Sequence, residues 1–237
     1  WMFLLVGGAL FTLVWRDLGE TVKPSGLTLT QQFKEYPELL RSPRFWGYCL
    51  ASAFSSGAFF AYLGGGPFVG SVVFGMSPKW VGIFFGAPAV GYFAGNWFTG
   101  RNAQRLGVNK LILWGALAVS AGTTLMLVIF WIGFGSATTF FGLMTIIGLG
   151  NGMVIPNATA GMLSVRPHLA GTASGLGGAI MIGGGACLAS LAVFLLKPET
   201  GAYPLILIMM FTSMAAVVAI LSVYRREARL RVSGTKH

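Results

Sequence analysis

Residues 111–165 read LILWGALAVSAGTTLMLVIFWIGFGSATTFFGLMTIIGLGNGMVIPNATAGMLSV, with no Asp, Glu, Lys or Arg. A helix needs roughly 20 apolar residues to cross the hydrocarbon core of a bilayer, so this stretch is long enough for two crossings. The segment from Gly133 to Ala137 supplies the turn between them, because glycine readily interrupts an apolar run. The stretch predicts an all-α membrane protein.

The rest of the chain has the same character. Apolar residues make up 55% of the 237 residues and charged residues 9%, whereas a soluble domain carries about a quarter charged residues. The uncharged runs predict six spanning helices, near residues 45–66, 81–100, 111–133, 139–163, 173–196 and 203–224. No Asp, Glu, Lys, Arg or His lies inside any of the six.

A further apolar run, Trp1 to Trp15, is too short to cross a bilayer comfortably. It lacks the preceding positive stretch and the following cleavage site of a signal peptide. We therefore expect the sequence to be a fragment that starts inside a helix. The predicted organisation is a truncated transmembrane helix at 1–15, a central cytoplasmic loop at 16–44, a six-helix region at 45–224 and a basic cytoplasmic tail at 225–237.

The positive charges decide the predicted orientation. Of the 16 Lys and Arg residues, all but Lys79 and Lys197 fall on one side of the proposed spans. This positive-inside pattern predicts that the central loop and the C-terminus are cytoplasmic. The net charge of +10 could suggest a nucleic-acid partner, but no basic cluster is interleaved with exposed aromatics, so we expect none.

The central loop contains a possible amphipathic helix. Thr28 and Gln31 form a possible capping box, and apolar residues recur at helical spacing at Leu29, Phe33, Tyr36 and Leu40. Such a helix would lie on the membrane surface, and Pro37 would bend or end it. A helix that binds a partner protein is the alternative.

The six spans fall into two sets of three, 45–133 and 139–224, with opposite orientation because three is odd. Inverted repeats of this kind build many secondary transporters. The first helix of each set carries glycines and a proline, around Pro67 and Pro156. We expect these interruptions to mark a binding region at the repeat interface.

The segment VRPHLAGTASGLGGAIMIGGG, residues 165–185, is rich in glycine. It lacks the Lys of a phosphate-binding loop and the strand that precedes a dinucleotide fingerprint, so it does not bind a nucleotide. In steps of four it carries a row of small residues: Gly171, Gly175, Ala179 and Gly183. Because such rows let two helices approach closely in lipid, we expect a docking face here. His168, before this helix, is either a proton relay or a solvated loop histidine.

The loop GRNAQRLGVNK, residues 100–110, carries Gly100, Gln104, Arg105, Gly107 and Lys110. Their spacing resembles the Gly-x-x-x-Asp-Arg-x-Gly-Arg-Arg/Lys loop motif of the major facilitator superfamily. The stretches LLRSPRFWGY, FAYLGGGPFV and GNGMVIPNATAGMLSVRPHLAGTASGLGGA further resemble the bicyclomycin-resistance (Bcr/CflA) type of drug:proton antiporter. Gln104 replaces the Asp of the motif, and Val108 and Asn109 stand where a second cation is usual, so we expect a weakened ion-pair latch.

The resemblance implies the six-transmembrane-helix C-terminal half of a major facilitator fold, a 3+3 inverted repeat. It implies a bacterial inner-membrane protein in which two halves rock about a central cavity and export small amphipathic drugs in exchange for protons. The N-terminal half of the same polypeptide would be its partner and would carry the coupling acids. The proton gradient would supply the energy, and no cofactor, metal site or catalytic residue is expected.

Other functions remain open at this point. One alternative is a transporter of a metabolite such as a sugar or an organic anion, and another is a non-transporting structural membrane subunit. An enzyme is not expected, because both histidines, His168 and His237, lie in a loop and at the extreme tail. Cys49 and Cys187 lie within spans without metal-site spacing and are expected to be buried small hydrophobes.

A cavity that accepts varied amphipathic cargo suits aromatic, Met and uncharged polar side chains. The candidates are Ser52, Ser55, Phe59 and Tyr62 on the first span, Tyr92 and Asn96 on the second, Asn151 and Asn157 on the fourth, and Met181 on the fifth. The aromatic candidates could instead pack against lipid or other helices. A buried amide needs a partner, which could be either a ligand or another helix.

Overall fold

A computed structural model describes residues 1–17 and 36–234, with side chains described as far as Glu227. The chain forms two compact units, Trp1–Tyr36 and Pro37–His237. The expected helix at the start of the first unit is present as α1 (Met2–Asp17), and its side chains are exposed. The amphipathic helix predicted from Thr28 onward falls mainly outside the described residues. Its described end, residues 37–40, is helical and buries Leu39 in place of Leu40.

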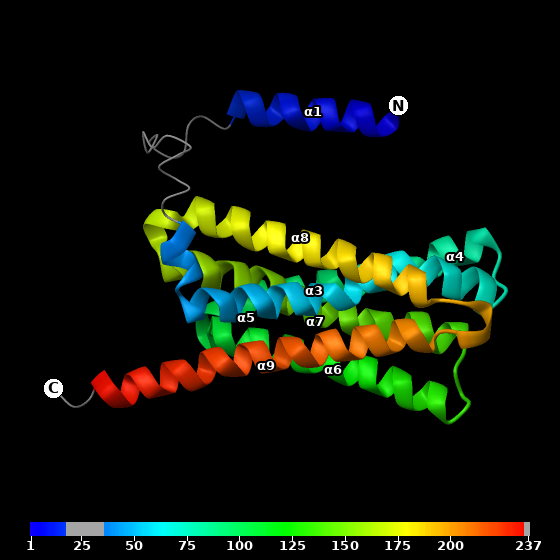
Figure 1. Cartoon of the computed structure of the whole chain (residues 1–237). Helices are drawn as coiled ribbons and strands as arrows, with labels where there is room; N and C mark the ends of the chain where they lie inside the picture. Colours follow the sequence, from blue (N-terminus) through cyan, green and yellow to red (C-terminus); the bar gives the residue numbers. More distant parts are fainter. Residues whose placement is uncertain (18–35, 235–237) are drawn as a thin grey trace. The chain divides into compact units, whose positions relative to one another are not determined.

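The second unit is a bundle of long helices that lie side by side (Figure 1). The helices are α3 (Pro43–Phe68), α4 (Pro78–Phe85), α5 (Ala87–Leu106), α6 (Val108–Trp131), α7 (Ala137–Val165), α8 (Ala170–Leu195) and α9 (Tyr203–Gly234). A π-helical segment, η1 (Val69–Val73), extends α3, and the short 3-10 helices η2 (Pro167–Leu169) and η3 (Pro198–Thr200) precede α8 and α9. Within the described residues, 5 helices are long and apolar enough to cross a membrane: Pro43–Val73, Val108–Trp131, Ala137–Val165, Pro167–Leu195 and Tyr203–Glu227.

The turn predicted between residues 133 and 137 is confirmed. Gly133 has a φ of 84°, in the left-handed region that glycine adopts without a Cβ clash. Ser136 then caps α7, since its hydroxyl accepts a hydrogen bond from the Thr139 amide at 3.2 Å. The two crossings predicted for residues 111–165 are therefore separate helices, α6 and α7.

The continuous span predicted over residues 81–100 is wrong, because two helices, α4 and α5, share this stretch. The break lies at Gly86, and Pro88 follows at the start of α5. Proline has no amide hydrogen and its ring clashes with the preceding turn, so a helix cannot run through unchanged. Asn96, Arg101 and Gln104 make α5 less apolar than the other long helices.

The interruptions predicted at Pro67 and Pro156 take different forms. After Pro67 the helix widens into η1, whereas α7 continues through Pro156 without a break. Proline cannot bond to the carbonyl four residues earlier, which in α7 belongs to Gly152. The Thr99 hydroxyl of α5 donates to this Gly152 oxygen at 3.4 Å. A neighbouring helix thus satisfies the group that Pro156 leaves free.

Each of two central helices contacts several others. α3 packs most extensively against α9, α8 and α7, and α7 packs against α5, α6 and α3. α6 and α9 also pack on each other. α9 continues to Gly234, so the first part of the predicted basic tail is helical.

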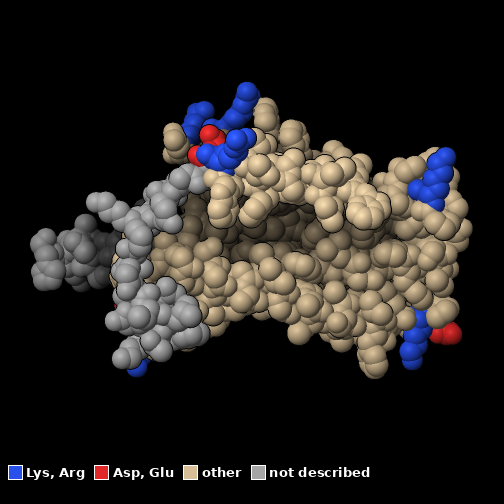
Figure 2. Space-filling view, turned by 90° about the horizontal axis from the view of Figure 1, so that it is seen from above, with Lys and Arg blue, Asp and Glu red and all other residues tan. Residues whose placement is uncertain are grey.

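Charged side chains avoid the middle of the bundle. Figure 2 shows Lys, Arg, Asp and Glu gathered toward two ends of the visible face, with an uncharged stretch between them. This distribution is expected of a protein that crosses a membrane, because a charged side chain is costly in hydrocarbon.

The close glycine packing within this chain is not where the sequence predicted it. A Cβ added at Gly171, Gly175 or Gly183 would meet nothing within 4 Å, and Ala179 is exposed. The predicted row is therefore no packing face between described residues of this chain, and α8 instead packs through Gly177 and Gly185. The face of α8 that carries the predicted row points away from the bundle, because α8 contacts α3 through its other face.

The tightest helix contact joins α5 and α7. A Cβ at Gly91 or Gly95 would collide with backbone atoms of α7, and one at Gly148 or Gly152 would collide with backbone atoms of α5. Both pairs have the G-x-x-x-G spacing that lets membrane helices approach closely.

We expect Gly152→Ala to destabilise the bundle by about 1–3 kcal/mol, because its Cβ would meet the fixed Tyr92 carbonyl and not a movable side chain. Gly142→Ala on the same helix is the control, since a Cβ there meets nothing within 4 Å. Thermal unfolding in detergent measures both. Equal unfolding temperatures for the two variants would contradict this assignment of the α5–α7 contact.

Candidate functional site

An apolar cavity of about 400 Å³ lies among α3, α5, α7 and α8, next to the end of α4. Its wall consists of Ser56, Phe59, Phe60, Leu63, Phe85, Pro88, Ala89, Tyr92, Gly148, Asn151, Ile155 and Met181. Aromatic and aliphatic side chains dominate, and none of these residues carries a formal charge. Such a surface binds uncharged or amphipathic molecules through their apolar parts.

Four of the predicted cavity residues line this cavity: Phe59, Tyr92, Asn151 and Met181. Two more support it from α3. The Ser52 hydroxyl lies 3.6 Å from the Met181 sulfur, and the Ser55 hydroxyl donates to Asn151 Oδ1 at 2.8 Å. Of the four α3 residues predicted to share the cavity face, Phe59 alone lies in the wall, whose other α3 residues are Ser56, Phe60 and Leu63.

The other three candidates lie elsewhere. Tyr62 is fully buried and stacks on Phe85 with ring centroids 4.7 Å apart. Asn96 and Asn157 are not in the cavity wall. Their amides donate to the carbonyls four residues earlier in their own helices, at 2.8 Å and 2.7 Å. These two asparagines therefore have partners without a ligand.

The sequence did not identify the contribution of the α4–α5 junction. Phe85, Pro88 and Ala89 line the cavity because the helix breaks at Gly86. In a continuous helix over 81–100, the side chains of these residues would point in other directions relative to the cavity. The signal was present in the pair Gly86 and Pro88, which is typical of a helix boundary.

The loop motif forms the tight turn between α5 and α6. Gly107 has a φ of 83° and ends α5, which explains why a glycine is needed there. Gln104, Arg105 and Lys110 are exposed, and they form no ion pair among the described residues. Arg101 instead stacks over Trp97, with its guanidinium carbon 4.5 Å from the ring centroid.

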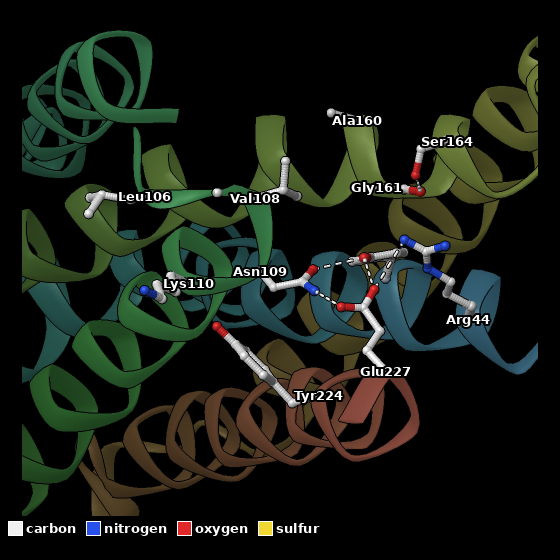
Figure 3. Close-up of a pocket in the computed structure, with 12 residues that line it drawn as sticks. Arg44, Leu106, Val108, Asn109, Lys110, Ala160, Gly161, Ser164, Tyr224 and Glu227 are labelled. Atoms are coloured by element: carbon white, nitrogen blue, oxygen red, sulfur yellow. Dashed lines mark hydrogen bonds and ion pairs between the residues drawn. The ribbon is translucent and has the colours of Figure 1, made fainter. Parts of the chain in front are cut away.

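A second cavity, of about 500 Å³, lies beside this turn and holds a polar network (Figure 3). The Asn109 amide donates to Glu227 Oε2 at 2.7 Å, and the Tyr48 hydroxyl donates to Asn109 Oδ1 at 2.8 Å. Arg44 Nη2 lies 3.1 Å from Glu227 Oε1. These residues come from α3, α6 and α9, so the network joins the ends of three helices.

The described residues at the same end of the bundle include a second group of charged contacts. Arg166, at the corner between α7 and α8, donates from Nε to Glu38 Oε1 at 2.6 Å. The exposed His168 ring lies 3.9 Å from the other carboxylate oxygen of Glu38. His168 therefore lies at the surface, away from the residues that line the apolar cavity.

We expect Glu227→Gln to lower the free energy of unfolding by about 0.5–1 kcal/mol. Glutamine keeps an oxygen that can accept from Asn109 but loses the ion pair with Arg44, and both partners are partly exposed, at 24% and 42%. Thermal unfolding in low salt measures the loss, which 1 M salt should largely remove.

The control is Glu199→Gln in η3, a carboxylate that pairs with no cation in the described part of the chain. A salt-independent loss, or the same loss in both variants, would show that the Arg44–Glu227 pair does not stabilise the helix ends.

Comparisons with known proteins match this chain to one family and to two relatives. A family model for the Major Facilitator Superfamily matches residues 1–190. Multidrug resistance protein D of Escherichia coli (strain K12) is 30% identical over 222 residues, which cover 92% of this chain and 54% of that protein. The uncharacterized MFS-type transporter YdgK of Bacillus subtilis (strain 168) is 27% identical over 221 residues, with the same two shares. The chain thus spans about half the length of the curated relatives it matches.

Proposed function

The chain belongs to the major facilitator superfamily, and on this premise we propose that it is the C-terminal half of a drug:proton antiporter of the Bcr/CflA type. Members of this superfamily are transporters and not enzymes. Together with the apolar helices, membership makes the chain an integral, multi-pass membrane protein. The relative called Multidrug resistance protein D supports drugs as the cargo.

The observation that carries this proposal is the character of the cavity among α3, α5, α7 and α8. Four aromatic side chains and Met181 line it, and no Lys, Arg, Asp or Glu of the described part of the chain does. Aromatic and Met side chains adapt to cargo of different shapes, whereas a sugar would need many hydrogen-bonding groups and an organic anion a cation. Amphipathic, largely aromatic drugs match this wall best.

The helix contacts support a 3+3 inverted repeat. In such a repeat, α3, α5 and α6 of the first set correspond to α7, α8 and α9 of the second. If each helix is exchanged with its counterpart, the α3–α9 contact becomes the α7–α6 contact. It also converts the α3–α8 contact into the α7–α5 contact, and it leaves the α3–α7 and α6–α9 contacts unchanged. In the proposed six-helix half, α4 and α5 together take the place of the second span.

The positive charges support an orientation with the central loop and the C-terminal tail in the bacterial cytoplasm. The exposed row Gly171, Gly175, Ala179 and Gly183 is then a face on which the N-terminal half of the same polypeptide could dock. We place the proton-carrying acids in that half, because none of the six predicted spans contains an acidic residue or a histidine. The proton gradient is the proposed energy source.

Drug-susceptibility profiling of the full-length gene, expressed in bacteria that lack their own efflux pumps, tests the proposal. We expect resistance to several amphipathic drugs, and collapse of the proton gradient should abolish export. Unchanged susceptibility to all of them, with the protein present in the membrane, would contradict drug export.

Phe59→Ala should then lower resistance to planar aromatic drugs several-fold, because it removes a ring from the cavity wall. Phe194→Ala on α8 is the control: Phe194 is 78% exposed in the bundle and is not part of the cavity wall. Minimum inhibitory concentrations, normalised to the amount of protein in the membrane, measure the difference. If both variants lose resistance alike, the cavity does not select the cargo.

A further inference from the structure

A groove of about 480 Å³ lies on the surface between the start of α3 and a late stretch of α9. Its lining consists of Pro43, Val218, Leu221, Ser222, Arg225 and Arg226. The α9 members recur at steps of three and four residues, so they form one continuous face of that helix. This face is apolar at Val218 and Leu221 and cationic farther along.

The groove lies at the edge of the membrane-spanning part of the chain. Pro43 begins one of the candidate spans, and Arg225 and Arg226 lie just before the end of another. Four residues of helix, about 6 Å, separate Leu221 from Arg225. The apolar part of the face therefore lies on the hydrocarbon side of the boundary, and the two arginines lie toward the lipid headgroups.

The two arginines carry positive charge that no described acid neutralises. Arg225 and Arg226 are exposed and form no ion pair with the acids that the structure describes. Their neighbour in sequence, Glu227, is already bonded to Arg44 and Asn109. Because both guanidinium groups are at the surface, a ligand can reach them without any opening of the bundle.

The residues of the groove match the parts of an anionic phospholipid. A guanidinium group binds a phosphate through two parallel hydrogen bonds. Val218, which is 68% exposed, and Leu221 offer apolar surface to an acyl chain. The described lining contains no carboxylate, so the ammonium group of a zwitterionic lipid would find no partner there. A headgroup of net negative charge therefore fits better than a zwitterionic one.

We propose that this groove binds one anionic phospholipid, such as phosphatidylglycerol, with its phosphate on Arg225 and Arg226 and an acyl chain along Val218 and Leu221. The lipid bridges α9 and the start of α3, because Pro43 belongs to the same lining. Basic side chains at a membrane boundary attract anionic lipids in general, whereas a groove limits the binding to a site that one lipid saturates. The inference goes beyond the proposed function, since it uses neither the apolar cavity nor its cargo.

Native mass spectrometry of the full-length protein in detergent tests the inference. The protein is titrated with phosphatidylglycerol or with phosphatidylethanolamine that has the same acyl chains. We expect the first phosphatidylglycerol to bind about tenfold more tightly than the first phosphatidylethanolamine. Arg225→Gln combined with Arg226→Gln should reduce this preference to about twofold or less by weakening phosphatidylglycerol binding. Both side chains are exposed, so this variant should remain folded, and thermal unfolding checks this.

Lys79→Gln combined with Lys197→Gln is the matched control. It removes the same two positive charges from exposed side chains that lie outside the groove lining. The preference for phosphatidylglycerol should survive in this variant. Arg225→Lys combined with Arg226→Lys keeps the charge but loses the two-pronged phosphate contact, so its preference should lie between those of the unmodified protein and the double glutamine variant.

An unchanged preference in the Arg225→Gln and Arg226→Gln variant overturns the inference. An equal loss in the lysine control also overturns it, because the attraction would then depend on net charge and not on the groove. Soluble glycerol phosphate carries the headgroup phosphate without acyl chains. If millimolar glycerol phosphate displaces the lipid, the groove is a site for a free phosphate and the inference fails as well.

Discussion

The bundle depends on one constraint: polar groups placed among apolar helices must find partners inside the protein, because lipid offers none. Pro156 leaves the Gly152 carbonyl free in α7, and the Thr99 hydroxyl of α5 donates to it. The Thr123 and Ser213 hydroxyls share a buried hydrogen bond of 2.9 Å between α6 and α9. Each bond satisfies a polar group and at the same time ties two helices together.

Close approach of α5 and α7 follows from glycine, and the cavity follows from that approach. The pairs Gly91 and Gly95 on α5, and Gly148 and Gly152 on α7, let the two backbones touch. This contact brings Tyr92 to the same wall as residues of α3 and α8. The cavity is therefore a product of helix packing more than of any single sequence motif.

Within the described residues, the Asn151 amide nitrogen departs from this constraint, since it is buried and has no hydrogen-bond partner. Its amide is unpaired where α3, α5, α7 and α8 surround an apolar space. Polar groups left unsatisfied inside a folded protein are costly, so few of them occur.

The sequence by itself determined that this chain is a helical membrane bundle and where most of its long helices lie. Hydrophobic length, charge placement and helical spacing are properties of one segment at a time, so they can be read locally. The tertiary structure decided which glycine row meets another backbone: the rows on α5, α7 and α8 have similar spacing, yet only those on α5 and α7 meet. It also separated Asn151 from Asn157, two amides on one helix, because Ser55 on α3 holds the first and nothing in the sequence of α7 reveals that partner. Partners come from other helices, and spacing within one helix does not specify them.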